Sequence, residues 1–266
     1  MTLDRLSFDT PRGPMPCLHA APHGHAPHAP LLVFLHGGRD CGDDLAVLER
    51  TAVLRHAAGL DARPCHVVAP QLRPDAAWTD HRAHLADLFH RMAEQLGADP
   101  ARIVVAGFSL GGTAAWQLAA DHPGRFAGLV AISARVPAGL PLDALAATPA
   151  RVFHGGFDHK LPPEDVAAHV TALREAGGTV ECTLFEQGNH FVDEQAFAEG
   201  AIEAWVMARR PAAAAPSPAT ATATATAPAP APATAPAPAS AAVPVATRAQ
   251  AAAAAGLDPQ EAPALA

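Results

Sequence analysis

Long apolar runs, a secretory leader and closely spaced cysteines are all missing from this 266-residue sequence. No apolar run approaches the ~20 residues that a membrane-spanning helix needs. Residues 1–8 mix acidic and basic side chains and contain no continuous apolar core, unlike a signal peptide. The four cysteines show no paired spacing. We therefore expect reduced thiols, no membrane span and a cytoplasmic location.

Positive charge is scarce as well. The chain has 18 Lys and Arg residues against 26 Asp and Glu residues, which gives a formal net charge of −8, and its one lysine is Lys160. An acidic chain without a basic stripe is a poor candidate for binding nucleic acid or an anionic membrane. We therefore expect a small-molecule partner and neither of those two. The sequence makes no prediction of oligomeric state.

Composition changes sharply after Arg210. Residues 211–266 contain no aromatic side chain and consist mostly of Ala, Pro and Thr. Such a segment cannot bury enough apolar surface to offset the entropy of ordering it, and repeated proline keeps it extended. The sequence thus predicts one globular domain over residues 1–210 and a disordered, spacer-like tail over residues 211–266.

Within residues 1–210, short apolar runs alternate with segments of helical periodicity. Strands are expected near residues 30–35, 65–70, 102–106, 128–133, 151–154 and 179–185, and helices near residues 44–58, 80–96, 113–122, 163–176 and 191–207. Continuous apolar strands alternating with helices are typical of a mostly parallel sheet that is covered on both faces. The predicted class is therefore α/β, with ligand-binding loops at the carboxyl ends of the strands.

The most informative stretch is Gly107-Phe108-Ser109-Leu110-Gly111-Gly112, which lies between a predicted strand and a predicted helix. A Gly-x-Ser-x-Gly in that position makes a turn so tight that the serine needs small residues two places before and after it. The turn exposes the serine hydroxyl above the sheet edge, beside the start of a helix that favours negative charge. Ser109 is therefore the candidate nucleophile.

Three other strands end in residues that complete a hydrolytic site. Asp158 and His190 each follow a strand, in the chain order of serine, acid and histidine. His190 would take and return a proton, and Asp158 would orient its imidazole. Gly37 and Gly38 follow the first of these strands, and we expect a backbone N–H there to join the N–H of Leu110 in an oxyanion hole.

These motifs resemble the small single-domain α/β-hydrolases of the carboxylesterase, acyl-protein thioesterase and dienelactone hydrolase group. Over residues 31–206 the chain is also similar to bacterial predicted peptidases and polyhydroxybutyrate-depolymerase-like esterases, in motifs such as Ala69-Pro70-Gln71, Asp99-Pro100-Ala101-Arg102 and the segment 119–126. Dienelactone hydrolases carry a cysteine nucleophile, whereas this chain has Ser109. The acid segment, Asp158-His159-Lys160-Leu161-Pro162, also departs from the small or apolar run usual in the family.

The resemblance implies a three-layer α/β-hydrolase fold and a serine esterase that works through an acyl-enzyme intermediate. A thioesterase or peptidase using the same triad, or a non-catalytic binding module, are the alternatives. Residues 134–150 are too few for a sizeable cap, so we expect an open site that accepts small soluble esters with short acyl groups.

Several other residues have two interpretations. Trp78 either lines the acyl or alcohol pocket or only packs. His19, His23, His25 and His28 form a His-rich segment, but their spacing matches no closed zinc pattern, so we expect no metal and no cofactor. His36 and His154 are expected to be structural, and His81, His84 and His90 to lie on a helix surface. Asp143 and Asp165 are alternative acids that we expect to be solvated.

Overall fold

The computed structural model describes residues 3–24, 26–59 and 64–209. In these residues one sheet of eight strands has the order β1-β2-β4-β3-β5-β6-β7-β8. The strands are β1 (Asp4–Thr10), β2 (Gly13–Ala20), β3 (Leu31–Leu35), β4 (His66–Pro70), β5 (Ile103–Phe108), β6 (Gly128–Ile132), β7 (Ala150–Gly155) and β8 (Val180–Phe185). The predicted tail, residues 211–266, lies outside the described residues and stays a prediction.

The sheet is parallel from β4 through β3 to β8, and antiparallel only where β2 pairs with β1 and β4. Its central strands are apolar at every position because the two faces are both buried. In β3, Leu31, Val33 and Leu35 enter one core cluster, whereas Leu32 and Phe34 enter the other. This alternation explains why the central strands read as continuous apolar runs. The predicted α/β class with a mostly parallel sheet is confirmed.

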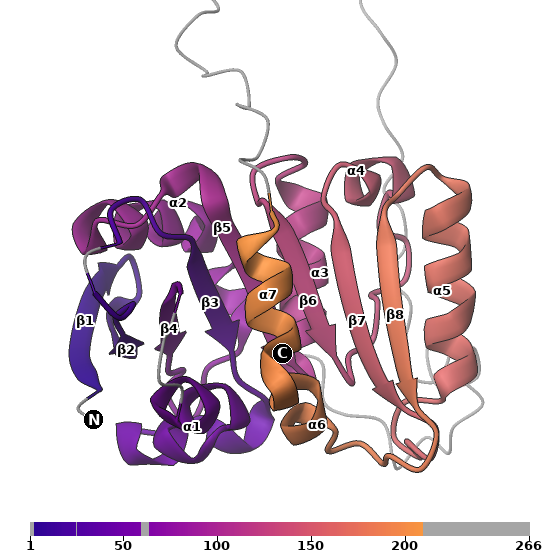
Figure 1. The fold of residues 1–266 in the computed structure, drawn as a ribbon, viewed down its shortest axis with the longest axis horizontal. Coiled ribbons are helices and arrows are strands. Elements are labelled where there is room, and N and C mark those ends of the chain that lie inside the picture. The colour runs from indigo at the N-terminus through magenta and orange to yellow at the C-terminus, as the bar shows by residue number, and fades with distance from the viewer. Residues whose placement is uncertain (1–2, 25, 60–63, 210–266) are drawn as a thin grey trace, which may run out of the picture. The chain divides into compact units, whose positions relative to one another are not determined.

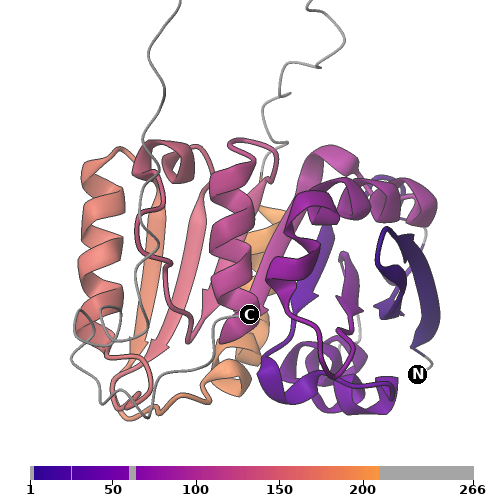
Figure 2. The same ribbon diagram turned by 180° about the vertical axis from the view of Figure 1, so that it is seen from behind.

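Helices cover both faces of the sheet, as the two opposite views show (Figures 1 and 2). One face carries α1 (Ala52–Gly59), α6 (Asp193–Phe197) and α7 (Ala201–Met207), and the other carries α2 (Trp78–Leu96), α3 (Leu110–Asp121), α4 (Leu142–Ala146) and α5 (Pro163–Glu175). Between β6 and β7 the only helix is the five-residue α4. The structure therefore has no sizeable cap domain at that position.

Some elements differ from the prediction. The hairpin of β1 and β2 was not expected, and it extends the sheet with two antiparallel strands. The helix predicted over residues 44–58 is a 3-10 segment (Leu45–Arg50) followed by α1, and Thr51 separates them by bonding back to Leu48 through its backbone N–H and its hydroxyl. The last predicted helix divides into α6 and α7, because Gly200 between them has a left-handed φ of 67°.

The loops that follow β3, β5, β7 and β8 carry Gly37, Ser109, Asp158 and His190. Parallel strands point their carboxyl ends to one edge of the sheet, so these four loops meet there. No helix in the described part of the chain is long and apolar enough to cross a membrane.

Candidate active site

Ser109 lies in the turn between β5 and α3, and its backbone is strained. Its φ of 52° and ψ of −117° fall in a region that L-amino acids rarely adopt. The backbone N–H of Ser109 donates to the carbonyl of Ile132 at the end of β6, at 2.9 Å, and its carbonyl accepts from the N–H of Thr113 at 3.0 Å. The neighbouring strand and the first turn of α3 thus hold the serine in a conformation that it would not adopt alone.

The glycines on each side of Ser109 are sterically required. A Cβ at Gly107 would collide with the backbone of Gly111, and a Cβ at Gly111 would collide with the carbonyl of Leu35 at the end of β3. The turn therefore brings β3, β5 and α3 into backbone contact, which agrees with the reading of the Gly-x-Ser-x-Gly motif from the sequence.

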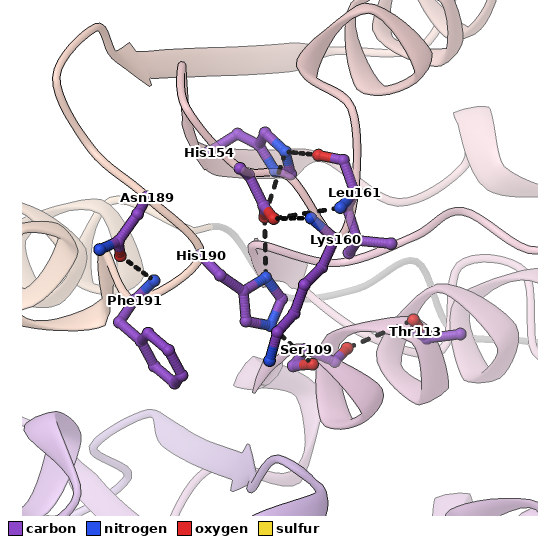
Figure 3. A network of polar contacts seen from close by, with 9 residues as sticks. Ser109, Thr113, His154, Lys160, Leu161, Asn189, His190 and Phe191 are labelled. Atoms are coloured by element: carbon purple, nitrogen blue, oxygen red, sulfur yellow. Dashed lines mark hydrogen bonds and ion pairs between the residues drawn. The ribbon is translucent and has the colours of Figure 1, made fainter.

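Ser109, His190 and Asp158 form one hydrogen-bonded chain (Figure 3). His190 Nε2 lies 3.1 Å from Ser109 Oγ, and His190 Nδ1 lies 2.8 Å from Asp158 Oδ2. The aspartate and the histidine are buried, whereas the serine is half-buried and borders a cavity. The structure thus brings together the three residues predicted from the sequence, with both imidazole nitrogens engaged.

The loop after β7 fixes the Asp158 carboxylate. Its Oδ1 accepts hydrogen bonds from the backbone N–H groups of Lys160 and Leu161, at 2.9 and 3.0 Å. Burial raises the pKa of Asp158, but the hydrogen bonds from His190, Leu161 and Lys160 outweigh burial and hold the pKa below its ordinary value. The carboxylate therefore stays ionised at neutral pH, even though it is buried. The unusual sequence of this segment is compatible with an ordered acid loop.

A second histidine lies beside the acid. His154, in β7, places Nε2 at 2.9 Å from the carbonyl oxygen of Leu161 and 3.6 Å from Asp158 Oδ2. It is buried and lies on the far side of the carboxylate from His190 (Figure 3). His154 thus supports the acid loop, which agrees with the structural role expected from the sequence.

His36 holds the glycine loop that follows β3. Its Nδ1 lies 2.7 Å from the carbonyl oxygen of Gly37, and its Nε2 accepts the backbone N–H of Leu72 at 3.0 Å. Since one nitrogen accepts and the other faces a carbonyl, the ring is neutral with its proton on Nδ1. Burial lowers the pKa of His36, which favours that neutral form. Trp78 completes the support by donating its indole N–H to the carbonyl of His36 at 3.1 Å.

The backbone N–H groups predicted as oxyanion donors differ in their surroundings. The backbone of Gly37 acts on the nearby carboxyl of Asp40, whose pKa it lowers. Within the part of the chain that the structure describes, the backbone N–H groups of Gly38 and Leu110 donate to no acceptor. Gly38 and Leu110 are also in contact range, because a Cβ at Gly38 would lie 3.0 Å from Cδ1 of Leu110. These two N–H groups are the available pair next to Ser109.

The first of two cavities at this edge of the sheet contains the serine. This serine cavity has a volume of about 300 Å³, and Ser109, His190, Phe108 and Phe191 line it together with charged side chains. Those charged side chains are Arg39, Asp40, Arg50, Lys160 and Asp193. A polar, charged chamber therefore surrounds the reacting hydroxyl.

The second cavity lies on the other side of the glycine loop. This apolar cavity has a volume of about 450 Å³, and its lining includes Cys41, Leu72, Trp78, Leu110, Ala114 and Pro137. Gly37 and Gly38 line both cavities, so the loop that carries them separates the two. Trp78 is thus buried and lines a cavity, and its role in binding the acyl or alcohol group stays a prediction.

The remaining predicted residues fall outside the site. His19 lies in β2, with Nε2 3.1 Å from His66 Nδ1, whereas His25 lies outside the described residues. Among the described side chains, no cluster of three or more His, Cys, Asp or Glu residues is arranged to hold a metal ion. Asp143 and Asp165 are exposed, as expected. The surface position expected for His81 is wrong, because its ring is buried, with Nδ1 3.2 Å from Nε2 of His84.

The fold and this arrangement agree with a family comparison. Residues 32–265 match the model of the alpha/beta hydrolase family. The chain belongs to the alpha/beta hydrolase family. Membership confirms the α/β-hydrolase fold and the family resemblance seen in the motifs.

Individual relatives are distant. A protein named "Putative carboxymethylenebutenolidase" from Escherichia coli O157:H7 is 30% identical over 118 residues, which cover 40% of this chain and 43% of that relative. A thermostable esterase of known structure is 24% identical with a TM-score of 0.67, over 78% of this chain and 62% of its own. A structure named "Putative Dienelactone Hydrolase" from Klebsiella pneumoniae is 20% identical with a TM-score of 0.60, over 77% of this chain and 95% of its own.

The chain thus spans less than half of the curated relative and less than two thirds of the thermostable esterase. At these identities the solved structures support the fold alone.

Several residues that line the serine cavity were not predicted as site residues, and three of them lie together: Arg39, Lys160 and Phe191. The guanidinium carbon of Arg39 lies 5.2 Å from the ring centroid of Phe191, and Lys160 Nζ lies 5.3 Å from it. Each of the three directly follows a predicted site residue or lies two positions from one. Their closeness in sequence to the glycine loop, the acid and the histidine is the signal that could have identified them.

Proposed function

We propose that this protein is a serine hydrolase that cleaves carboxylic esters through an acyl-enzyme intermediate. The observation that carries the proposal is the hydrogen-bonded chain from Ser109 Oγ through His190 to Asp158, at 3.1 and 2.8 Å. A serine hydroxyl becomes nucleophilic when an imidazole can take its proton and a carboxylate holds that imidazole in place. The strained turn at Ser109 and the free N–H groups beside it support the same chemistry.

The proposed reaction has two balanced halves. Ser109 Oγ forms a bond to the acyl carbon while His190 Nε2 takes the hydroxyl proton, and the N–H groups of Gly38 and Leu110 stabilise the oxyanion. His190 then gives the proton to the leaving oxygen as its bond to the acyl carbon breaks. In the second half, a water molecule attacks the acyl carbon while His190 takes its proton. His190 then returns the proton to Ser109 Oγ as the acyl–serine bond breaks, which releases the carboxylic acid and restores the serine hydroxyl.

The two cavities suggest where each half of an ester lies. The leaving oxygen must be within reach of His190, since this residue returns the proton. His190 lines the serine cavity and not the apolar cavity, whereas Leu110, an oxyanion donor, lines the apolar cavity. We therefore assign the leaving group to the serine cavity and the acyl chain to the apolar cavity.

The test is hydrolysis of p-nitrophenyl butyrate by the full chain and by Ser109→Ala. We expect the alanine variant to lose turnover by about 10⁴-fold or more, with little change in melting temperature, because the hydroxyl is not a core group. A fluorophosphonate probe should label Ser109, as mapped by mass spectrometry. Turnover at the wild-type rate by the variant, or labelling of another residue, would refute the assignment.

The same triad supports thioester or peptide cleavage, and a substrate panel separates these alternatives. A butyryl thioester and an aminoacyl p-nitroanilide should both be cleaved more slowly than the oxygen ester at equal concentration. Faster cleavage of the thioester or the anilide would assign the protein to that class instead. No turnover of any of the three would favour a non-catalytic binding module.

A further inference from the structure

The serine cavity holds two cations against one aromatic ring. Arg39 belongs to the 3-10 turn η1 (Gly38–Asp40), and Lys160 belongs to the loop after β7, more than a hundred residues later. Their cationic groups lie 5.2 and 5.3 Å from the centre of the Phe191 ring, close enough for cation–π attraction. The fold thus brings two positive charges from distant segments to one point beside the reacting serine.

The ring that gathers these cations is itself fixed. The backbone N–H of Phe191 donates to the side-chain oxygen of Asn189 at 2.8 Å. Its ring centroid lies 5.4 Å from that of His190 and 6.0 Å from that of Phe108. Although 47% of Phe191 is exposed, packing against both neighbours keeps the ring at the cavity wall. The two cations are exposed, but their contact with this fixed ring places them beside the imidazole.

Neither cation lies within salt-bridge distance of a carboxylate in the part of the chain that the structure describes. In the described residues, Arg39, Lys160 and the nearby Arg50 make no salt bridge to a carboxylate. The cavity also contains two acids, Asp40 and Asp193, so the three cations leave one net positive charge. Like charges gathered at one ring repel each other, and an anion bound between them would relieve that repulsion.

We infer that Arg39 and Lys160 bind an anionic group on the leaving alcohol of the substrate, so that the preferred substrates are acyl esters of hydroxy acids. The inference rests on the proposed function and on the assignment of the leaving group to the cavity that His190 lines. Guanidinium and ammonium groups are the donors that recognise carboxylates, and Arg39 supplies a planar fork while Lys160 supplies a point charge. In Figure 3 the Lys160 side chain extends from the acid loop to the level of Ser109.

The reaction remains the ester hydrolysis described above. The bond between the acyl carbon and the oxygen of the hydroxy acid breaks, and His190 protonates that oxygen. The carboxylate of the leaving hydroxy acid keeps its charge throughout, so it contributes binding and no chemistry. Removing one of its partners should therefore raise KM more than it lowers kcat.

The test compares 4-butyryloxybenzoate, which carries the anion on its leaving phenol, with the neutral 4-butyryloxybenzamide. Wild-type kcat/KM should be about tenfold higher for the benzoate, which is the size expected of a charged hydrogen bond to exposed cations. Lys160→Met and Arg39→Met should each lower the benzoate-to-benzamide ratio by about fivefold to tenfold. Raising NaCl from about 0.05 M to about 0.5 M should also lower the ratio.

Two control variants isolate the charge. Lys160→Arg retains the positive charge and should keep most of the benzoate preference. Arg73→Met removes an exposed cation from outside the serine cavity and should leave the ratio at its wild-type value. Equal kcat/KM values for both esters, or an unchanged ratio in Lys160→Met and Arg39→Met, would overturn the inference while leaving the esterase proposal intact. Failure to cleave either ester would instead refute the proposed function.

Discussion

The two cavities on either side of the Gly37–Gly38 loop differ in almost every physical respect. The serine cavity contains the hydroxyl, the imidazole and five charged side chains, whereas the apolar cavity is lined by side chains such as Trp78 and Leu72. One loop, braced by His36 and Trp78, separates them. This contrast underlies the proposed division of roles, in which the serine cavity would hold the reacting groups and the charged leaving group, and the apolar cavity would hold the acyl chain.

The largest expected effect, on kcat, tests whether the residues of the serine cavity alone carry out the reaction. Asp158→Asn should lower kcat by about 10⁴-fold, because the amide no longer holds His190 in the correct tautomer. The factor should be the same for acetate and hexanoate esters, as measured by steady-state kinetics. Circular dichroism should show an unchanged fold. A loss that depended on acyl length would mean that Asp158 also shapes the apolar cavity, and a wild-type kcat would mean that another acid orients His190.

An intermediate effect is expected when the apolar cavity is partly filled. Ala114, on α3, lines this cavity, so Ala114→Leu should shorten the space available for an acyl chain. In the wild type, kcat/KM should rise from acetate to hexanoate. In the variant the hexanoate value should fall by about tenfold, because two buried methylenes are worth about 1.6 kcal/mol.

The matched control is Ala83→Leu, which makes the same change at an exposed position of α2. It should leave the dependence of kcat/KM on acyl length unaltered. If Ala114→Leu lowered the acetate and hexanoate values equally, the apolar cavity would not be the acyl site.

A smaller effect concerns pH and the two acids of the serine cavity. Burial and the charge of Asp193 raise the pKa of Asp40 above its ordinary value of 3.8, against the Gly37 backbone and Arg39. Burial likewise raises the pKa of Asp193, against its own backbone and the charges of Arg55 and His190. A raised pKa means that each carboxylate is neutralised at a higher pH than usual. As pH falls toward that range, the cavity becomes more positive.

Butanesulfonate, whose charge does not titrate in this range, should therefore inhibit more strongly as pH falls from neutral. The inhibition constant should decrease by severalfold in the wild type and by a smaller factor in Asp40→Asn/Asp193→Asn, where only His190 still gains charge. A neutral inhibitor such as butanamide serves as the reference. Weaker inhibition by the sulfonate at lower pH in the wild type would contradict the assignment of anion binding to this cavity.

The smallest expected effect comes from the tail. Ending the chain after Arg210 should leave both cavities, the melting temperature and kcat/KM essentially unchanged, because residues 211–266 supply almost no large apolar side chains for a core. Differential scanning calorimetry and the acyl series together check this. A melting temperature several degrees lower, or an altered preference among acyl lengths, would show that the tail contacts the domain.

Sequence reasoning succeeded where local chemistry determines structure. Continuous apolar runs predicted the central strands, and Gly107, Ser109 and Gly111 predicted the turn because no larger residues fit it. Prediction from the sequence failed where the structure depends on contacts between segments that are distant in the chain. The β1–β2 hairpin depends on pairing with β4, and the apolar cavity depends on Trp78 meeting Pro137 across the fold. The hydrophobic periodicity of a single segment carries no information about which distant segment it will contact.

The position of the only lysine has a practical consequence. In this sequence, reagents that acylate side-chain amines have one target, Nζ of Lys160. Because Lys160 lines the cavity that contains Ser109, a dye or resin attached through amines would occupy the cavity mouth. Immobilised preparations of the protein should therefore be coupled through another functional group.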